Sequence, residues 1–126
     1  MGRSVRDGID PPRFVLVSWL LRSGDVLASL DVARTRVERR RGLMGRPESE
    51  GAMWIERTRW VHTFGMRFPI DVAHLDADGV VIAMGTLRPH RLGRPVLKAR
   101  SVVEARAGSF ERWRLSLGDR LEVRGP

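Results

Sequence analysis

The sequence contains no cysteine and only one lysine, Lys98, among its 126 residues. Without cysteine, the chain has no disulfide bond, no thiolate metal ligand and no cysteine nucleophile. The absence of disulfides is typical of proteins in a reducing compartment. We therefore expect a cytoplasmic location, with export as the open alternative.

The sequence has no apolar run as long as a membrane-spanning helix, which needs about 20 residues. The run at residues 14–21 is β-branched and aromatic, which favours a short buried strand. Its place after Arg13 also fits the h-region of a signal peptide, but no small-x-small cleavage site follows. We predict a strand at this position and no membrane span.

The glycine-rich motifs of nucleotide sites and the Gly-x-Ser-x-Gly turn of serine hydrolases are also missing. Asp76-x-Asp78-Gly79 begins like a calcium loop, but the later oxygen ligands are absent, so a hairpin turn is predicted. The histidines lack the close spacing that recurs in zinc sites. They are His62, His74 and His90. We predict no metal and no cofactor.

Acidic residues are scarce relative to basic ones, and the formal net charge is +8. Two stretches, residues 34–46 and 88–100, are rich in arginine, and neither contains an aromatic residue that would stack on a nucleic-acid base. Such an excess favours a polyanionic partner, either nucleic acid or an acidic membrane surface. Arginine-rich codon usage in a GC-rich genome is the alternative, so nucleic-acid binding is kept as a secondary hypothesis.

The pattern of apolar residues predicts a mainly-β fold. Apolar residues at 26, 28, 30 and 32 alternate as in a half-buried strand. About eight short strands with one or two short helices predict a single antiparallel β-sandwich or small barrel. We expect this domain to span residues 13–126, after a loose leader at residues 1–12. The predicted strands are residues 14–21, 26–32, 51–55, 60–64, 70–75, 80–84, 96–97, 101–105 and 120–123.

Two short helices are expected. Thr35 and Glu38 form a capping box, in which each side chain satisfies the other residue's backbone N–H at the start of a helix. Gly45 is a C-terminal cap for that helix, and Pro47 prevents its continuation. Ser109 is expected to cap a single helical turn that ends at Trp113.

The most unusual stretch of the sequence is residues 60–71, which ends at the carboxylate of Asp71. Both faces of the strand 70–75 are largely apolar, so Asp71 should be at least half buried and needs a partner. A cation is expected, either Arg67 or an arginine of the first helix such as Arg41 or Arg46. The sequence alone leaves open whether Asp71 makes a structural ion pair or lies in a pocket.

Large apolar side chains surround this carboxylate in the sequence. Each of them is expected to pack in the core, but as a group they could line an apolar groove beside a few polar residues. They are Met53, Trp54, Trp60, Met66 and Phe68.

Four motifs follow one another along the chain: Arg41–Arg46 (Arg-Gly-Leu-Met-Gly-Arg), Met66–Asp71 running into Leu75–Val81, Val103–Gly108, and Gly118-Asp119. In their order and spacing they resemble a bacterial and archaeal family known as the domain of unknown function 192. The resemblance covers residues 30–123. It implies a compact, mostly antiparallel β fold with a short helix that carries Gly-Leu-Met, and it implies no established activity.

The chain departs from the family pattern at one place. Most relatives carry Met-Lys-Asn before the Pro-Leu/Ile-Asp, whereas here Met66-Arg67 reaches Pro69 without an asparagine. A ligand contact through that asparagine is therefore not available in this chain, and His62-Thr63 is the candidate replacement.

These features together predict a non-enzymatic module that binds a small anionic or polar ligand, or a partner. The pocket is expected between the Gly-Leu-Met helix end and the segment from Trp60 to Asp71. The candidate ligand-binding residues are Arg41, Met44, Arg46, Trp60, His62, Met66, Arg67, Phe68 and Asp71. A hydrolase-like enzyme that uses Asp71 and His62 as an acid–base pair is the alternative, followed by nucleic-acid binding through the arginine clusters.

Overall fold

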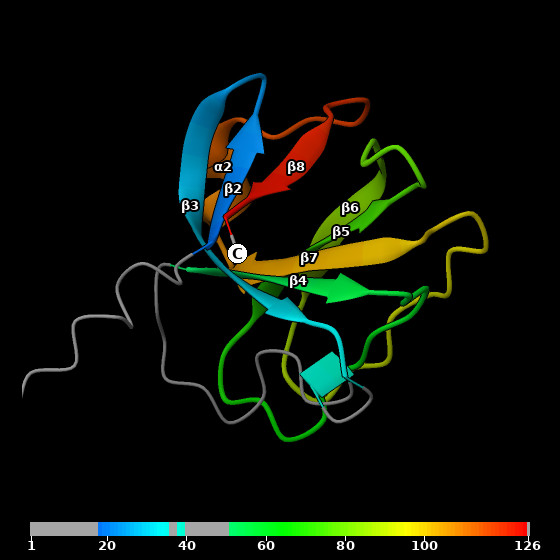
Figure 1. Ribbon diagram of the computed structural model, residues 1–126. Coiled ribbons are helices and arrows are strands. Elements are labelled where there is room, and N and C mark those ends of the chain that lie inside the picture. The colour runs from blue at the N-terminus through cyan, green and yellow to red at the C-terminus, as the bar shows by residue number, and fades with distance from the viewer. Residues whose placement is uncertain (1–17, 36–37, 40–50, 126) are drawn as a thin grey trace, which may run out of the picture.

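The computed structural model describes residues 18–35, 38–39 and 51–125. The predicted leader at residues 1–12 and the motif Arg41–Arg46 lie outside the described residues. Seven strands and one helix, α2, form the described part of the chain (Figure 1). Their bounds are β2 Ser18–Arg22, β3 Asp25–Ala33, β4 Ala52–Glu56, β5 Ile70–Leu75, β6 Val81–Leu87, β7 Ser101–Arg106, α2 Ser109–Trp113 and β8 Leu121–Arg124.

The strands belong to one mixed sheet with the order β6-β5-β7-β4-β3-β2-β8. The prediction of a mainly-β fold is confirmed. Every pair of neighbours is antiparallel except β3 and β4, which run in parallel. A parallel pair needs a crossover connection rather than a hairpin, and residues 34–51 provide it. The expectation of a fully antiparallel sheet is therefore corrected at this one pair.

The sheet curls on itself, but its edges β6 and β8 meet at one end only. An isolated bridge joins Val80 to Arg120, and the N–H of Val81 donates to the carbonyl of Asp119 at 2.8 Å. Gly79 lies in this contact with a φ of +82°, and a Cβ on it would be 2.4 Å from the carbonyl oxygen of Leu121. The two edges can therefore approach here only because residue 79 has no side chain.

The curled sheet has a hydrophobic core on each face. Alternate residues of β5 point to opposite faces, and all six are buried. One core lies against α2 and contains Leu20, Leu30, Ala52, Ala73, Leu75, Val81, Val103, Ala105, Phe110, Leu115 and Leu121. The other contains Ala33, Met53, Ile55, Val61, Met66, Ile70, Val72 and Val102. The predicted burial of both faces of this strand is confirmed.

Two of the predicted strands are wrong. Residues 60–64 make only an isolated bridge, between His62 and Leu92, and residues 96–97 form no strand. The reason lies at Thr63, which is fully buried and accepts hydrogen bonds from Arg91 N–H through its hydroxyl and from His90 N–H through its carbonyl. These bonds hold the segment in an irregular conformation instead of a regular ladder.

The predicted capping box is confirmed. The N–H of Glu38 donates to the hydroxyl of Thr35 at 3.1 Å, and the N–H of Thr35 donates to a carboxylate oxygen of Glu38 at 3.0 Å. The hydrogen bonds from the backbone of Thr35 and Arg34 hold the pKa of Glu38 below its usual value. Within the described ranges, no helix has the length and apolar character needed to cross a bilayer.

Candidate functional site

Asp71, the single carboxylate of residues 60–71, is buried, with 4% of its surface exposed. It lies on the face of β5 that packs against α2, directly opposite Thr86 of β6. Its Oδ1 accepts the hydroxyl hydrogen of Thr86 at 2.8 Å. Its Oδ2 accepts the backbone N–H groups of Gly108 and Phe110, each at 3.0 Å. Three donors from two elements therefore fix this carboxylate.

The two amides belong to the first turn of α2, a helix that has no side-chain cap of its own. Its N-cap is Gly108, in the left-handed region with a φ of 96°. The first backbone N–H groups of a helix have no partner inside it and carry a partial positive charge. Asp71 supplies both the missing acceptor and the opposite charge, so a side chain from the sheet caps the helix.

The expected cationic partner of Asp71 is not found among the described residues. Arg67 is exposed, and the structure brings neither it nor any other described cation to the carboxylate. Charge-assisted bonds from backbone N–H groups stabilise a carboxylate as an ion pair would. Arg41 and Arg46, the other candidates, lie outside the described residues.

Arg22 of β2 holds the opposite end of α2. Its guanidinium donates to the carbonyl of Trp113 at 2.7 Å, to that of Arg114 at 3.0 Å and to the carboxylate of Asp119 at 3.1 Å. These carbonyls end the helix and lack intrahelical donors. Two charged side chains from the sheet therefore hold α2 at its two ends.

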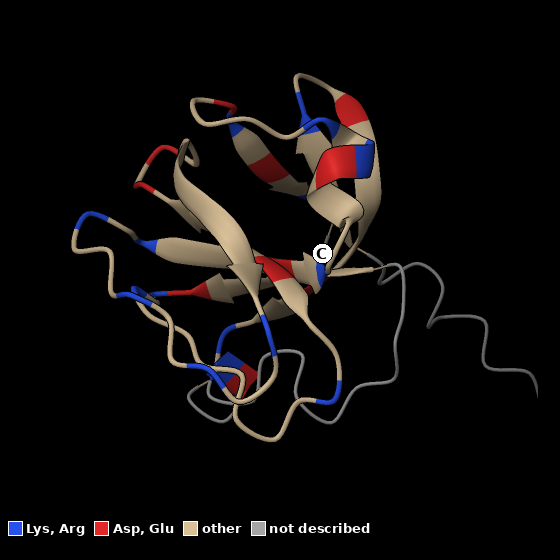
Figure 2. Cartoon of the chain, turned by 180° about the vertical axis from the view of Figure 1, so that it is seen from behind, with Lys and Arg blue, Asp and Glu red and all other residues tan. Residues whose placement is uncertain are grey.

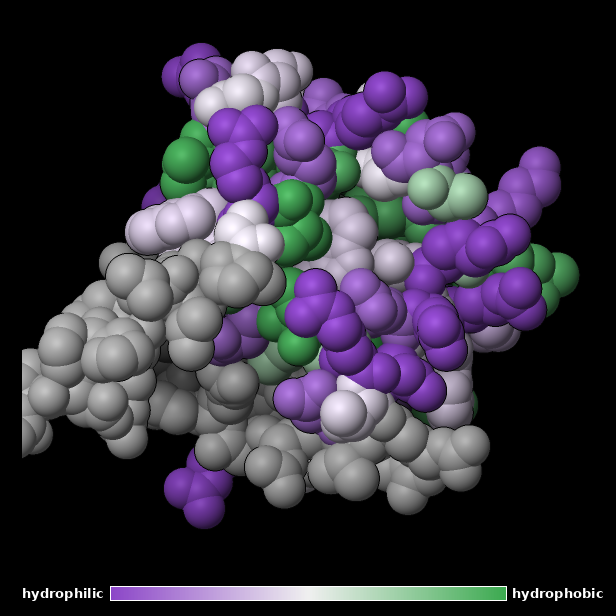
Figure 3. Space-filling view, in the orientation of Figure 1, coloured by the Kyte–Doolittle hydropathy of each residue, from purple (hydrophilic) through white to green (hydrophobic). Residues whose placement is uncertain are grey.

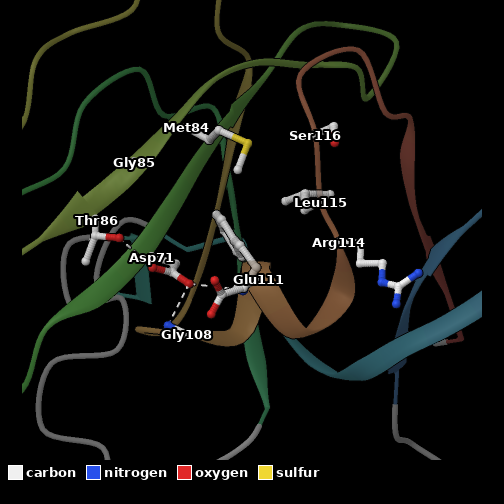
Figure 4. Close-up of a pocket in the computed structure, with 10 residues that line it drawn as sticks. Asp71, Met84, Gly85, Thr86, Gly108, Glu111, Arg114, Leu115 and Ser116 are labelled. Atoms are coloured by element: carbon white, nitrogen blue, oxygen red, sulfur yellow. Dashed lines mark hydrogen bonds between the residues drawn. The ribbon is translucent and has the colours of Figure 1, made fainter.

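A cleft of about 520 Å³ opens beside Asp71, between the β5–β6 hairpin and the chain from α2 to Ser116 (Figure 4). Phe110, Met84 and Leu115 give it apolar walls. Asp71 and Glu111 both line the cleft, and in Figure 4 the side chain of Arg114 extends away from Asp71. The charged side chains around the cleft are therefore two carboxylates and one guanidinium.

The other predicted site residues that the structure describes do not line this cleft. Met66 packs in the core on the opposite face of β5, with Phe68 partly buried against it. Trp60 and Arg67 are exposed, and His62 is half-buried. Of the six candidates that the structure describes, only Asp71 lines the cleft; Arg41, Met44 and Arg46 lie outside the described residues.

Thr86, Gly108, Phe110 and Glu111 are functional candidates that sequence reasoning missed. Two of them act through the backbone N–H, which any residue except proline carries, so their identity gives no signal. The predicted turn at Asp76–Gly79 brings β6 beside Asp71, but a register shift between His74 and Leu75 decides that Thr86 lies opposite it.

His62 and His90 lie on neighbouring loop segments, whereas His74 lies apart from them in the sheet. Nδ1 of His62 accepts the N–H of Phe64 at 3.1 Å, and His74 lies inside β5. No group of three or more metal-ligating side chains occurs in the described part of the chain. Burial lowers the pKa of His74, and its Nε2 has no hydrogen-bond partner.

The fold and the cleft define a small mainly-β domain in which a carboxylate of the sheet caps a single-turn helix. The family model of the domain of unknown function 192 (DUF192), described as "Uncharacterized ACR", matches residues 20–123. The chain belongs to this family, as the resemblance of its motifs indicated.

A UPF0127 protein of Pyrococcus abyssi (strain GE5 / Orsay) is 31% identical over 98 residues, which cover 74% of this chain and 84% of that protein. Two solved structures share the fold. One is a "putative transcription regulator" from Sinorhizobium meliloti 1021, with a TM-score of 0.71 and 24% identity, covering 85% of this chain and 92% of that one. The other is a protein of unknown function from Novosphingobium aromaticivorans DSM 12444, with a TM-score of 0.70 and 21% identity, covering 84% and 83%. At these identities the structures show the fold alone.

Proposed function

We propose that the protein is a non-enzymatic module that binds a small polar ligand in the cleft beside Asp71. The observation that carries this proposal is a buried carboxylate, fixed by three hydrogen bonds, at the wall of a cleft with apolar sides. Ligand sites are typically concave and apolar, with a few polar groups in fixed positions.

The residues that line the cleft favour a polar ligand over an anionic one, both of which the sequence had predicted. The lining contains two carboxylates, Asp71 and Glu111, and one cation, Arg114, whose side chain extends away from Asp71. An anion would be repelled there, whereas hydroxyl and amine groups would donate hydrogen bonds to the carboxylates. A hydroxyl-rich or amine-bearing ligand therefore fits the cleft better than an anionic one.

A binding role also fits the state of Asp71 better than catalysis does. Its oxygens already accept three hydrogen bonds, so it is held as an acceptor rather than left free to abstract a proton. His62, the predicted partner in an acid–base pair, is not among the residues that line the cleft. The hydrolase-like alternative would therefore need an acid–base pair other than Asp71 and His62.

A thermal-shift screen against sugars, polyols, amines, phosphates and carboxylates tests this proposal. A ligand at about 100 times its dissociation constant stabilises the folded state by about 2.7 kcal/mol, which raises Tm by several degrees. We expect hydroxylated or amine compounds to raise Tm in the wild type and much less in Glu111→Gln. Glu122→Gln, which removes an exposed carboxylate from β8, is the matched control and should respond as the wild type does.

The same screen distinguishes binding in the cleft beside Asp71 from binding at the pocket that was predicted from the sequence. If phosphates or carboxylates raise Tm and Arg67→Ala abolishes the response while Glu111→Gln keeps it, the site lies on the segment that carries Arg67. A screen in which no compound stabilises the wild type would contradict ligand binding at either place.

A further inference from the structure

Three aromatic rings form a row on the surface of the segment between β4 and β5. The rings of Trp60, His62 and Phe64 lie next to one another although the backbone that carries them is irregular. The ring centroids of Trp60 and His62 are 6.4 Å apart, and those of His62 and Phe64 are 5.2 Å apart and stacked. Trp60 is 45% exposed and Phe64 is 48% exposed. Large flat surfaces of two rings are therefore open to solvent.

The loop before β7 holds this row in place. Along the two segments, Thr63 N–H donates to Arg91 O at 2.8 Å, Gly93 N–H to Val61 O at 2.9 Å and Val96 N–H to Arg59 O at 2.9 Å. The indole N–H of Trp60 donates to the carbonyl of Gly93 at 2.8 Å. The structure thus brings the rings beside an arginine-rich stretch that contains no aromatic residue of its own.

These two segments, residues 57–70 and 88–100, form what we call the aromatic–arginine surface. They contain eight cations and no carboxylate, and all eight are exposed. The rest of the chain then has 15 of the 23 basic residues against 15 acidic ones, so the net charge of +8 arises from this surface. Figure 2 shows basic residues along the loops at the left and lower side of the molecule, besides others near the helix at the top.

A second cleft, also lined by arginine side chains, adjoins the aromatic–arginine surface. It has a volume of about 630 Å³ and is lined by Trp54 and Glu56 together with Arg57, Arg59 and Arg100. Figure 3 shows hydrophilic side chains gathered where the ends of β4 and β7 meet the neighbouring loops. Arg59 borders this cleft and immediately precedes Trp60, so the cleft adjoins the aromatic row along the chain.

We propose that the aromatic–arginine surface binds single-stranded nucleic acid. Proteins that bind single strands combine a positively charged track for the phosphates with exposed aromatic rings on which bases stack. Both parts are present here, on segments that are held together by hydrogen bonds. This inference does not rest on the ligand proposed for the cleft, because the two sites share no residue.

The geometry favours a single strand over a duplex. The aromatic row lies on irregular backbone, with one isolated bridge between His62 and Leu92, and presents no helix or β-ribbon to a major groove. Rings can stack only on bases that are already unstacked and unpaired. Acidic peptides and anionic membranes would satisfy the charge but would not use the flat ring faces of Trp60 and Phe64.

Fluorescence anisotropy with a labelled single strand of about 12 nucleotides tests the proposal, since single-strand site sizes are roughly 4–16 nucleotides. If four to six phosphates are neutralised, affinity should fall roughly 50- to 300-fold between about 50 and 200 mM salt. A duplex of the same length should bind more weakly than the single strand. Equal or tighter binding of the duplex would overturn the proposal.

Two pairs of variants separate stacking from charge. Phe64→Ala should weaken binding roughly 5- to 100-fold with an unchanged salt slope, because stacking contributes without releasing counterions. Trp19→Ala removes an equally exposed aromatic from β2 and should bind as the wild type does. A triple variant on the surface should reduce the dependence of affinity on salt; it combines Arg88→Gln, Arg91→Gln and Arg94→Gln. A control triple removes the same charge elsewhere and should leave the salt dependence unchanged; it combines Arg112→Gln, Arg120→Gln and Arg124→Gln.

Three results would overturn the proposal. The first is no measurable binding of the strand by folded wild-type protein at low salt. The second is an equal loss of affinity in both arginine triples, which would show that only net charge matters. The third is displacement of the strand by polyglutamate or by anionic lipid vesicles as effectively as by unlabelled strand, which would assign the surface to an acidic protein or a membrane. Glu111→Gln should leave the affinity unchanged.

Discussion

The carboxylate of Asp71 in β5 accepts a 3.0 Å hydrogen bond from the backbone N–H of Phe110, a residue 39 positions further along the chain. This bond sets the start of α2, and Arg22 binds the carbonyls at its end. A helix of five residues is far too short to form alone in water. Its position, and with it one wall of the cleft, therefore depends on two charged side chains of the sheet.

Replacing Asp71 with alanine should destabilise the fold strongly. Asp71→Ala leaves the N–H groups of Gly108 and Phe110 without their acceptor, one of them in a buried hydrogen bond, and we expect a loss of about 3–5 kcal/mol. Asp71→Asn should cost less, roughly 1–3 kcal/mol, because the amide oxygen can still accept from the backbone while Thr86 reverses its hydroxyl. Urea unfolding measures both values.

Thr86→Val is the control for this pair, since it removes one hydroxyl bond to the same carboxylate at a cost of about 0.5–1.5 kcal/mol. If Asp71→Ala proves no more destabilising than Thr86→Val, the carboxylate does not hold the helix.

Arg22 should not be replaceable by lysine. Its planar guanidinium donates to three acceptors, and a lysine ammonium cannot reproduce that fork. We expect Arg22→Met to lose roughly 2–4 kcal/mol and Arg22→Lys to recover less than half of it. Chemical denaturation of both variants measures the difference, and complete recovery by lysine would show that charge alone acts at this position.

Gly79 should tolerate alanine much less well than Gly24 does. Both residues have a positive φ, +82° and +85°, so alanine is strained at either position by about 1–2 kcal/mol. Only at Gly79 would the Cβ meet a backbone atom, the carbonyl of Leu121 at 2.4 Å, whereas nothing lies within 4 Å at Gly24. Thermal unfolding of both variants should show a clearly larger loss for Gly79→Ala. Equal losses would mean that the contact between β6 and β8 is easily displaced.

Stability should fall as the pH falls below about 6.5 because of His74. Burial lowers the pKa of this histidine in the folded state, while the backbone of Arg59 opposes that shift. The unfolded chain binds the proton near its ordinary value of 6.5, so between 6.5 and the lower folded pKa it holds more protons than the folded protein. The stabilisation is complete above 6.5 and declines below it, by at most about 1.4 kcal/mol per pH unit.

Denaturation at pH values on either side of this window measures the effect. His74→Leu removes the titrating group from a buried position with 8% exposure and should flatten the dependence in this range. An unchanged slope in that variant would assign the pH dependence to other groups.

Local patterns predicted several elements well. The capping box of Thr35 and Glu38 and the turn at Asp76–Gly79 each arise from bonds between near neighbours, which the sequence displays directly. The burial of residues 70–75 followed from apolar residues on both faces. The parallel pairing of β3 with β4 could not be predicted, because the direction in which two strands pair is not displayed in the apolar pattern of either strand alone.

The surroundings of Asp71 show why the site was only partly predictable. The pairing of Leu75 with Val81, continued regularly, would place Asp71 opposite Gly85, which has no side chain to donate a bond. A register shift between His74 and Leu75 places Thr86 there instead. A shift of one residue exchanges the faces of a strand, and nothing in the local sequence fixes it. Asp71 was recognised as buried, but its hydroxyl and backbone donors were not.

The pairing of β2 with β8 also bears on how the protein is made. Trp19 lies opposite Arg124, so one edge of β2 acquires its partner only when the strand starting at Leu121 has been synthesised. Until then a nascent chain exposes that edge, and unpaired strand edges promote aggregation. A ribosome that stalls before residue 121 would therefore release a product prone to self-association, and refolding should be slow for a chain of this length.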